Sequence, residues 1–172
     1  MRVTTFFSTV SLLLLGTIAL AQSVTYDFDG SADFSKFKTY SWARGNPVPD
    51  ELNHRRIVQA IEAQLTLKGL AKVERNPDVL VAYHASFDTD LQISAMSTSW
   101  GPYRWGGGSG VARATEVLTG TLAIDIVDAR TKNIVWRAMA SDDLNPNAKP
   151  EKRAKNIQKT AEKMFKHYPP KR

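Results

Sequence analysis

A long hairpin is the clearest pattern in this chain. Residues 115–141 contain two apolar, β-branched segments separated by a polar hinge, residues 128–133. The apolar side of the first segment carries Leu118, Leu122, Ile124 and Ile126, while the positions between them are mixed. In the second segment Ile134, Trp136, Ala138 and Ala140 alternate with Val135, Arg137 and Met139. This alternation predicts two central antiparallel strands with one face against helices, and Asp128 is expected to bond backbone N–H groups in the turn.

Shorter alternating segments predict the rest of the sheet. They lie at 24–28, 38–42, 70–73 and 79–87, with turn residues between them. Together with two helical patterns they predict the fold class: α+β, with an antiparallel or mixed sheet of about five or six strands and two helices packed on one face.

The two helices are predicted over 50–68 and 150–168. The first has Asp50 or Asn53 as its cap, a buried stripe at helical spacing, and Gly69 where a left-handed C-terminal cap is expected. The second has Pro150 in its first turn. Its apolar stripe is Ala154, Ile157, Ala161, Met164, Phe165 and Tyr168, and the opposite stripe is Lys152, Lys155, Lys159, Lys163 and Lys166.

Between the central strands, the pattern is lost over residues 88–113, and Leu91 and Ile93 leave open a continuation of the strand before it. The segment 94–110 is rich in Gly and Ser and carries Trp100, Tyr103 and Trp105. A flexible insert of this length is predicted, and its aromatic residues are a candidate contact for a partner. The alternative is that they fold back over the hairpin.

The first residues have the pattern of an export signal. Arg2 precedes an apolar core at 10–20, and Ala19-Leu20-Ala21 before Gln22 fits a cleavage site. We therefore expect a signal peptide at 1–21, with an uncleaved anchor as the alternative, and a single domain at 22–172 without a transmembrane segment. An exported protein is periplasmic or secreted, and nucleic acid is not expected as a partner.

Charge is concentrated at the C-terminal end. The chain has a formal net charge of +6, and residues 149–172 hold nine basic and two acidic side chains, a balance of +7. The lysine stripe is either a solvated face or a contact for an anionic surface, with Phe165 and Tyr168 free to dip into a lipid interface. The chain has no cysteine, which excludes a thiol nucleophile, a thiolate metal site and lipid attachment to an N-terminal Cys.

No motif points to catalysis or to a cofactor. The three histidines, His54, His84 and His167, are far apart and lack metal-site spacing. The carboxylates Asp27, Asp29 and Asp33 resemble a calcium loop superficially, but its later ligands are missing, so a strand end and turn is the preferred interpretation. Ser109 lies in a glycine run that does not fit a nucleophile elbow.

Several segments together resemble the DUF4136 family. They are ADFSKFKTYSW at 32–42, NPDVLVAY at 76–83 and TGTLAIDIVDARTKNIVWRA at 119–138. The resemblance covers nearly all of residues 22–172 and implies a domain of unknown function found mostly in bacterial envelope proteins, many of them lipoproteins. This chain departs from many relatives in having no lipobox Cys, which implies a form without a lipid anchor.

These observations lead to three functional hypotheses. The first is an exported, non-enzymatic envelope protein that binds another component, whether protein, glycan or lipid headgroup; the oligomeric state stays open. The second is an enzyme whose site is assembled from distant residues, such as His84 with Asp125 or Asp88. The third is a peripheral binder of anionic membrane.

Overall fold

The computed structural model describes residues 23–96 and 111–171, which form a mixed six-stranded sheet with two helices. The strand order is β1-β6-β5-β4-β2-β3. The first four strands in this spatial order, β1, β6, β5 and β4, are antiparallel to their neighbours within this group. β2 is parallel to both β4 and β3. The elements are β1 (Ser23–Phe28), a 3-10 turn (Phe34–Lys36), β2 (Thr39–Trp42), α1 (Glu51–Leu67), β3 (Ala71–Lys72), β4 (Val79–Met96), β5 (Val111–Asp128), β6 (Ile134–Leu144) and α2 (Pro150–Phe165).

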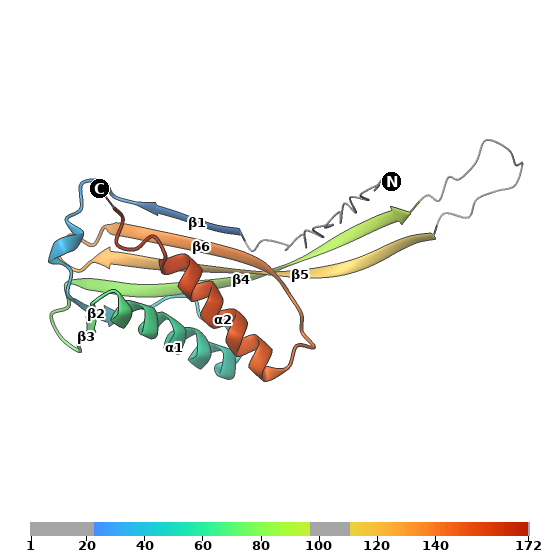
Figure 1. The fold of residues 1–172 in the computed structure, drawn as a ribbon, viewed down its shortest axis with the longest axis horizontal. Helices are drawn as coiled ribbons and strands as arrows, with labels where there is room; N and C mark the ends of the chain where they lie inside the picture. The colour runs from blue at the N-terminus through green and yellow to red at the C-terminus, as the bar shows by residue number, and fades with distance from the viewer. Residues whose placement is uncertain (1–22, 97–110, 172) are drawn as a thin grey trace, which may run out of the picture.

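The predicted fold class is confirmed. Both helices lie on the same side of the sheet, and the central hairpin is β5 and β6 joined by the expected turn (Figure 1). Asp128 accepts hydrogen bonds from the backbone of Arg130 and Thr131 at 2.7 and 2.9 Å, as predicted. Its pKa is lowered because these N–H groups stabilise the carboxylate.

The limits predicted for the insert at 88–113 were wrong. β4 continues to Met96 and β5 begins at Val111, and the two strands pair without interruption over 18 residues each. Segments of mixed polarity can form strands when a neighbour supplies the hydrogen bonds, and alternation alone does not show this. The rest of the insert lies outside the described residues.

α1 forms the crossover that makes β2 parallel to β4. Its first turn is capped by Asp50, which accepts hydrogen bonds from the N–H groups of Leu52 and Asn53 at 2.8 and 3.1 Å. It ends where Gly69 takes the left-handed conformation, with φ +84°. Both ends agree with the sequence-based prediction.

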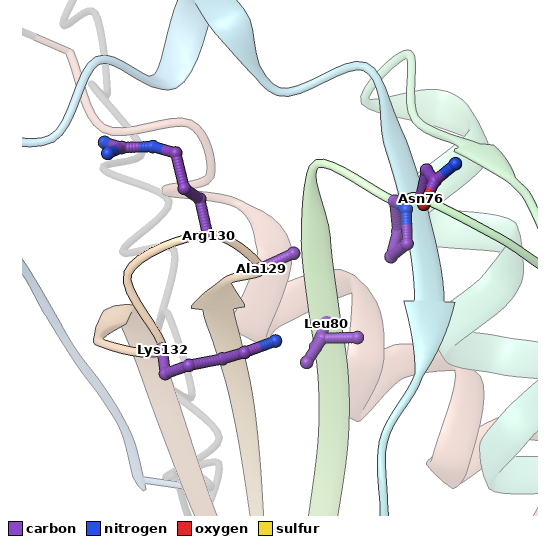
Figure 2. Close-up of a pocket in the computed structure, with 6 residues that line it drawn as sticks. Asn76, Leu80, Ala129, Arg130 and Lys132 are labelled. Atoms are coloured by element: carbon purple, nitrogen blue, oxygen red, sulfur yellow. The ribbon is translucent and has the colours of Figure 1, made fainter.

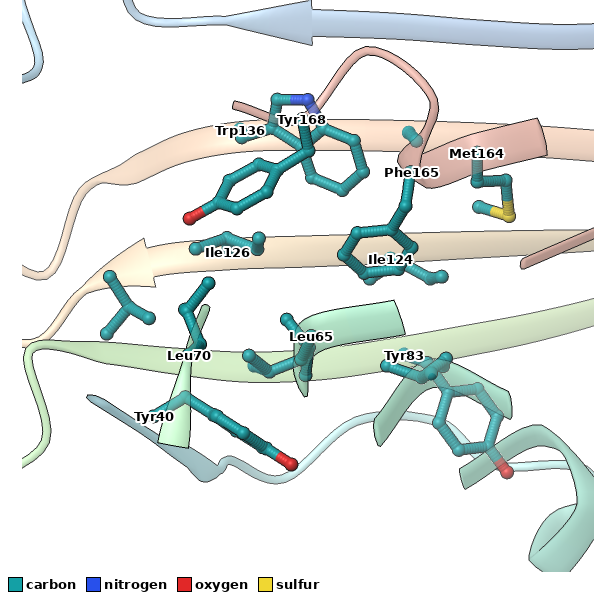
Figure 3. Packing of buried hydrophobic residues seen from close by; sticks show 14 of the residues in the cluster. Tyr40, Leu65, Leu70, Tyr83, Ile124, Ile126, Trp136, Met164, Phe165 and Tyr168 are labelled. Carbon is teal, nitrogen blue, oxygen red and sulfur yellow. The ribbon is translucent and has the colours of Figure 1, made fainter. Parts of the chain in front are cut away.

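The core fills the layer between the helices and the sheet (Figure 3). Trp136 of β6 is fully buried, and its ring centroid lies 5.2 Å from that of Phe165 and 5.3 Å from that of Tyr168. Burial raises the pKa of the Tyr168 phenol far above its ordinary value. The apolar stripe predicted for the second helix is therefore its buried side.

β6 departs from simple alternation at one point. A register shift between Ile126 and Val127 of β5 leaves Ile134 46% exposed and brings Val135 into the core at 3%. A bulge of this kind reverses the facing of the residue beside it. The predicted facing was therefore wrong at Ile134 and Val135, although it holds from Trp136 onward.

Phe165 tests the helix-to-sheet layer. Phe165→Ala is expected to lower the free energy of unfolding by about 3–5 kcal/mol, because the side chain is fully buried against Trp136 and leaves a cavity. Chemical denaturation measures the loss. Leu67→Ala is the matched control, since Leu67 is 76% exposed and its removal should change stability little. Equal effects at the two sites would contradict the proposed packing.

Asp78 ties β2 to the start of β4. Its carboxylate accepts hydrogen bonds from Lys38 N, Thr39 N and Thr39 Oγ1 at 2.8–2.9 Å. These bonds, with the Lys38 backbone as the largest cause, lower its pKa.

Asp78→Asn should therefore lower the free energy of unfolding at pH 7 by about 1 kcal/mol. Because the pKa of Asp78 is lower in the folded state, its carboxylate stabilises the fold at any pH above its pKa in the unfolded chain, which is about 4. This stabilisation is lost as the pH falls through the pKa of Asp78 in the folded protein. The difference between wild type and variant should shrink at pH 3 in parallel denaturation curves. Asp142→Asn, at an exposed site, should show no such dependence.

Candidate binding surface on the uncovered face of the sheet

The side of the sheet opposite α1 and α2, here called the uncovered face, carries mostly small and polar side chains, with Met139 as an exposed apolar exception. Cross-strand register places them in rows, because residues paired across antiparallel strands point the same way. One row is Ser86, Thr121 and Ser141, and the next is Asp88, Thr119 and Asp143. The rows are linked sideways by hydrogen bonds, 2.9 Å between the hydroxyls of Thr121 and Ser141 and 3.3 Å from Thr119 Oγ1 to Asp143 Oδ1.

A charged cluster lies at the centre of this face. Asp125 is only 4% exposed, and Arg137 binds both of its carboxylate oxygens, at 2.5 and 2.7 Å. These hydrogen bonds raise the pKa of the Arg137 guanidinium. His84 lies next to the pair, with Nε2 3.5 Å from Asp125 Oδ2. The cluster is held by three adjacent strands, β4, β5 and β6, so its geometry is fixed by the sheet.

The carboxylate of Asp125 is engaged mainly by Arg137. Arg137 occupies both oxygens of Asp125, and 3.5 Å is longer than a hydrogen bond between His84 and that carboxylate. The side chains of His84 and Arg137 are 43% and 46% exposed, so both can also contact a partner.

A shallow hollow lies at the turn end of the same face (Figure 2). Its volume is about 370 Å³, and it is lined by Asn76, Pro77, Leu80, Ala129, Arg130 and Lys132. The Lys132 ammonium points toward Leu80, whereas the Arg130 guanidinium points away from it. The hollow is formed where the turn before β4 meets the turn between β5 and β6, and it does not include His84 or Asp125.

A family model for DUF4136, a domain of unknown function, matches residues 24–170. The chain belongs to the DUF4136 family. No curated protein matches it. The family assignment confirms the resemblance seen in the sequence, and its match covers every strand and helix described above except Ser23, the first residue of β1.

Solved structures share the fold of this DUF4136 domain at low sequence identity. A PDZ domain protein from Parabacteroides distasonis is 18% identical with a TM-score of 0.56, over 87% of this chain. This chain spans only 36% of that protein. A PelC dodecamer from Paraburkholderia phytofirmans is 11% identical with a TM-score of 0.52, over 84% of this chain and 96% of that one. At such identities the similarity concerns the fold alone.

The contact residues proposed from the sequence fall in two groups, and only the lysines of the second helix lie among the described residues. Trp100, Tyr103 and Trp105 lie outside the described residues. The five lysines of the second stripe are all exposed, four of them on α2 and Lys166 as its C-terminal cap: Lys152, Lys155, Lys159, Lys163 and Lys166. Phe165 and Tyr168, which the membrane-binding alternative required to be free to enter a lipid interface, are 0% and 3% exposed and belong to the core. That part of the alternative was wrong, because Trp136 attracts both rings inward.

Sequence reasoning named His84 and Asp125 together but missed Arg137. The sequence did contain a signal for this ion pair. Asp125 and Arg137 both lie at positions of the hairpin strands that face away from the apolar side, and strand pairing brings them opposite each other. The bulge hides this pairing. If strand partners are counted outward from the turn without the bulge, every pair is shifted by one residue, and Asp125 is placed opposite Trp136 instead of Arg137.

The other sequence candidates have local structural roles. Asp29 accepts hydrogen bonds from Ser31 and Asp33 from Ser35, which lowers the pKa of both carboxyls. The ring of His54 bonds the Tyr83 hydroxyl at 2.5 Å, and that of His167 stacks on Tyr26 at 4.6 Å. Within 23–89 and 117–171, no group of three potential metal ligands occurs.

The part of the chain that the structure describes holds no helix with the length and apolar character of a membrane span.

Arg137 tests the central cluster. Arg137→Ala should lower the free energy of unfolding by about 1–3 kcal/mol, because it leaves the buried Asp125 carboxylate without its two charged hydrogen bonds. Denaturation of Arg137→Ala, Asp125→Ala and the double variant gives the coupling between them. A double variant as unstable as the sum of the single changes would show that the pair does not act as a unit. Arg130→Ala, in the exposed turn, is the control.

Proposed function

We propose that this DUF4136 protein is an exported, non-enzymatic component of the bacterial cell envelope, and that its uncovered face binds another envelope component. The carrying observation is the one-sided packing of the helices, which leaves a rigid polar surface with a charged cluster at its centre (Figure 1). Export is supported by the signal-like sequence at 1–21.

Several features of the face suit recognition. Hydroxyl and carboxylate groups on neighbouring strands offer donors and acceptors at fixed spacing, and the cross-strand hydrogen bonds hold them in place. Arg137 can stack on or donate to a partner while it stays attached to Asp125. Such a surface fits a polar protein face or a glycan.

Photo-crosslinking in cells tests this function. A benzophenone amino acid at Thr121, on the uncovered face, should give a discrete adduct in the envelope fraction, and Arg137→Ala in the same chain should reduce it. The same probe at Gln59, exposed on α1, is the control. Equal labelling from both positions, or an adduct unaffected by Arg137→Ala, would contradict binding through this face. Recovery of the chain in the cytoplasmic fraction would contradict export.

A second candidate function rests on the lysine stripe of α2. At about 100° per residue its five lysines fall within an arc of roughly 80°, opposite the buried side, and span about 21 Å. Lysines near an anionic lipid surface contribute about 1 kcal/mol each. Because Phe165 and Tyr168 are buried, the attraction would be electrostatic and would weaken with salt.

Vesicle sedimentation tests this second function. The chain should bind vesicles containing phosphatidylglycerol at low salt, and Lys155→Glu, Lys159→Glu and Lys163→Glu together should reduce binding at least tenfold, on the order of the charge lost. A matched triple change at Lys36, Lys38 and Lys132, outside α2, should have a smaller effect. Binding that is indifferent to the α2 changes, or equal on neutral vesicles, would exclude the lysine stripe as the contact.

A further inference from the structure

The outer edge of β4 is covered only along its first half. Beyond β2, the chain continues beside β4, with Ala43 N donating to Val81 O at 2.8 Å and Asn46 N to Tyr83 O at 3.1 Å. The last such bond runs from Ala85 N to Asn46 O, at 2.9 Å. Pro47 follows, and the chain turns away toward α1.

The bonds show which backbone groups of β4 face this edge. All three involve odd-numbered residues, and successive residues of a strand point their N–H and C=O groups to opposite sides. The N–H and C=O groups of Phe87, Thr89 and the odd positions after them therefore face the same edge. Among the described residues, nothing is bonded to Phe87 or Thr89 on that side.

This edge lacks most of the features that usually protect an exposed strand, and its only charged side chains are those of Asp88 and Asp90. Residues 86–96 contain no Pro, Gly or Lys, and β4 pairs with β5 along this length without a register shift. The outermost strands of the sheet differ, because β1 has six residues and β3 has only two. Short edges are poor templates for another strand, whereas a long regular edge is a good one.

Beyond Leu118 the sheet consists of two strands only. β6 ends its ladder at the pair Leu118 and Leu144, whereas β4 and β5 continue to Met96 and Val111. Figure 1 shows this two-stranded ribbon projecting away from both helices and from β1. A two-stranded ribbon is marginally stable in water, and Phe87 near its base is 49% exposed.

We propose that the free edge of β4, residues 86–96, pairs with the same edge of a second copy of this chain to form an antiparallel, twofold-symmetric dimer. In such a pairing odd positions meet odd positions. The N–H and C=O groups that face the edge in both copies are then paired by about ten backbone hydrogen bonds. A single peptide strand would leave its own outer edge free, whereas a second copy brings its own β5 on the far side. The ribbon's projection gives the second copy access without contact with α1 or α2 (Figure 1).

This inference goes beyond the proposed function, because it uses the edge of β4 and not the uncovered face. The two can therefore fail separately. A dimer with no crosslink from Thr121 would leave this inference standing and reject the proposed function, and a monomer with a specific crosslink would do the reverse.

Thr89→Pro is the central test. Proline removes the N–H that faces the free edge and leaves the β4–β5 ladder intact, since that ladder uses the even positions. Light scattering after size exclusion should give the mass of two chains for the unmodified protein and of one chain for Thr89→Pro. We expect the dissociation constant of the dimer to rise on the order of tenfold or more. Thr89→Ala, which keeps the N–H, should stay dimeric.

Hydrogen exchange gives a second measurement that does not depend on how the variant folds. In the unmodified chain, the amides of Phe87 and Thr89 should exchange more slowly as the protein concentration increases. A monomer with fast exchange at both amides would overturn the proposal, and so would an oligomer that Thr89→Pro leaves unchanged while circular dichroism shows it folded. If Thr89→Pro unfolds, the concentration dependence of the two amides decides.

Discussion

The packing of α2 against the apolar side of the hairpin is the interaction on which the rest of this structure depends. Trp136 of β6 contacts both Phe165 and Tyr168, and all three rings are buried. Fully burying an aromatic side chain of this size contributes about 1.5–3 kcal/mol, and no disulfide is available to replace it, since the chain has no cysteine. α2 and Tyr168 are thereby fixed on β6, the same strand that pairs with β1.

One-sided packing divides the sheet into two faces with different chemistry. On the helix side, Ile124, Ile126 and Tyr83 are excluded from water. On the other side neither α1 nor α2 supplies apolar contact. Asp125 is the one buried charged residue among those whose burial is described, and Arg137 holds it with two hydrogen bonds. The polar face is thus a structural consequence of having a single helical layer, and it is the surface for which we propose a binding role.

The difference in length between the strands and the helical layer has a further consequence. β4 and β5 have 18 residues each, whereas β6 has 11 and β1 has six. Backbone pairing therefore extends beyond the part of the sheet that the core supports. Among the described residues, no segment pairs with the outer edge of β4 beyond Ala85. The edge of β4 and the uncovered face are separate surfaces, so the self-association and the recognition proposed above need not block each other.

The sequence by itself determined the elements whose signals are local. Helical spacing located α1 and α2, Asp50 and Gly69 marked the ends of α1, and alternation assigned Ile124 and Ile126 to the core side. Only the tertiary structure decided where pairing partners lie. The bulge that exposes Ile134, the meeting of Asp125 with Arg137, and the extension of β4 to Met96 depend on hydrogen bonds between separate strands. Such bonds depend on register across the sheet, and the side chains of one segment do not encode the register of another.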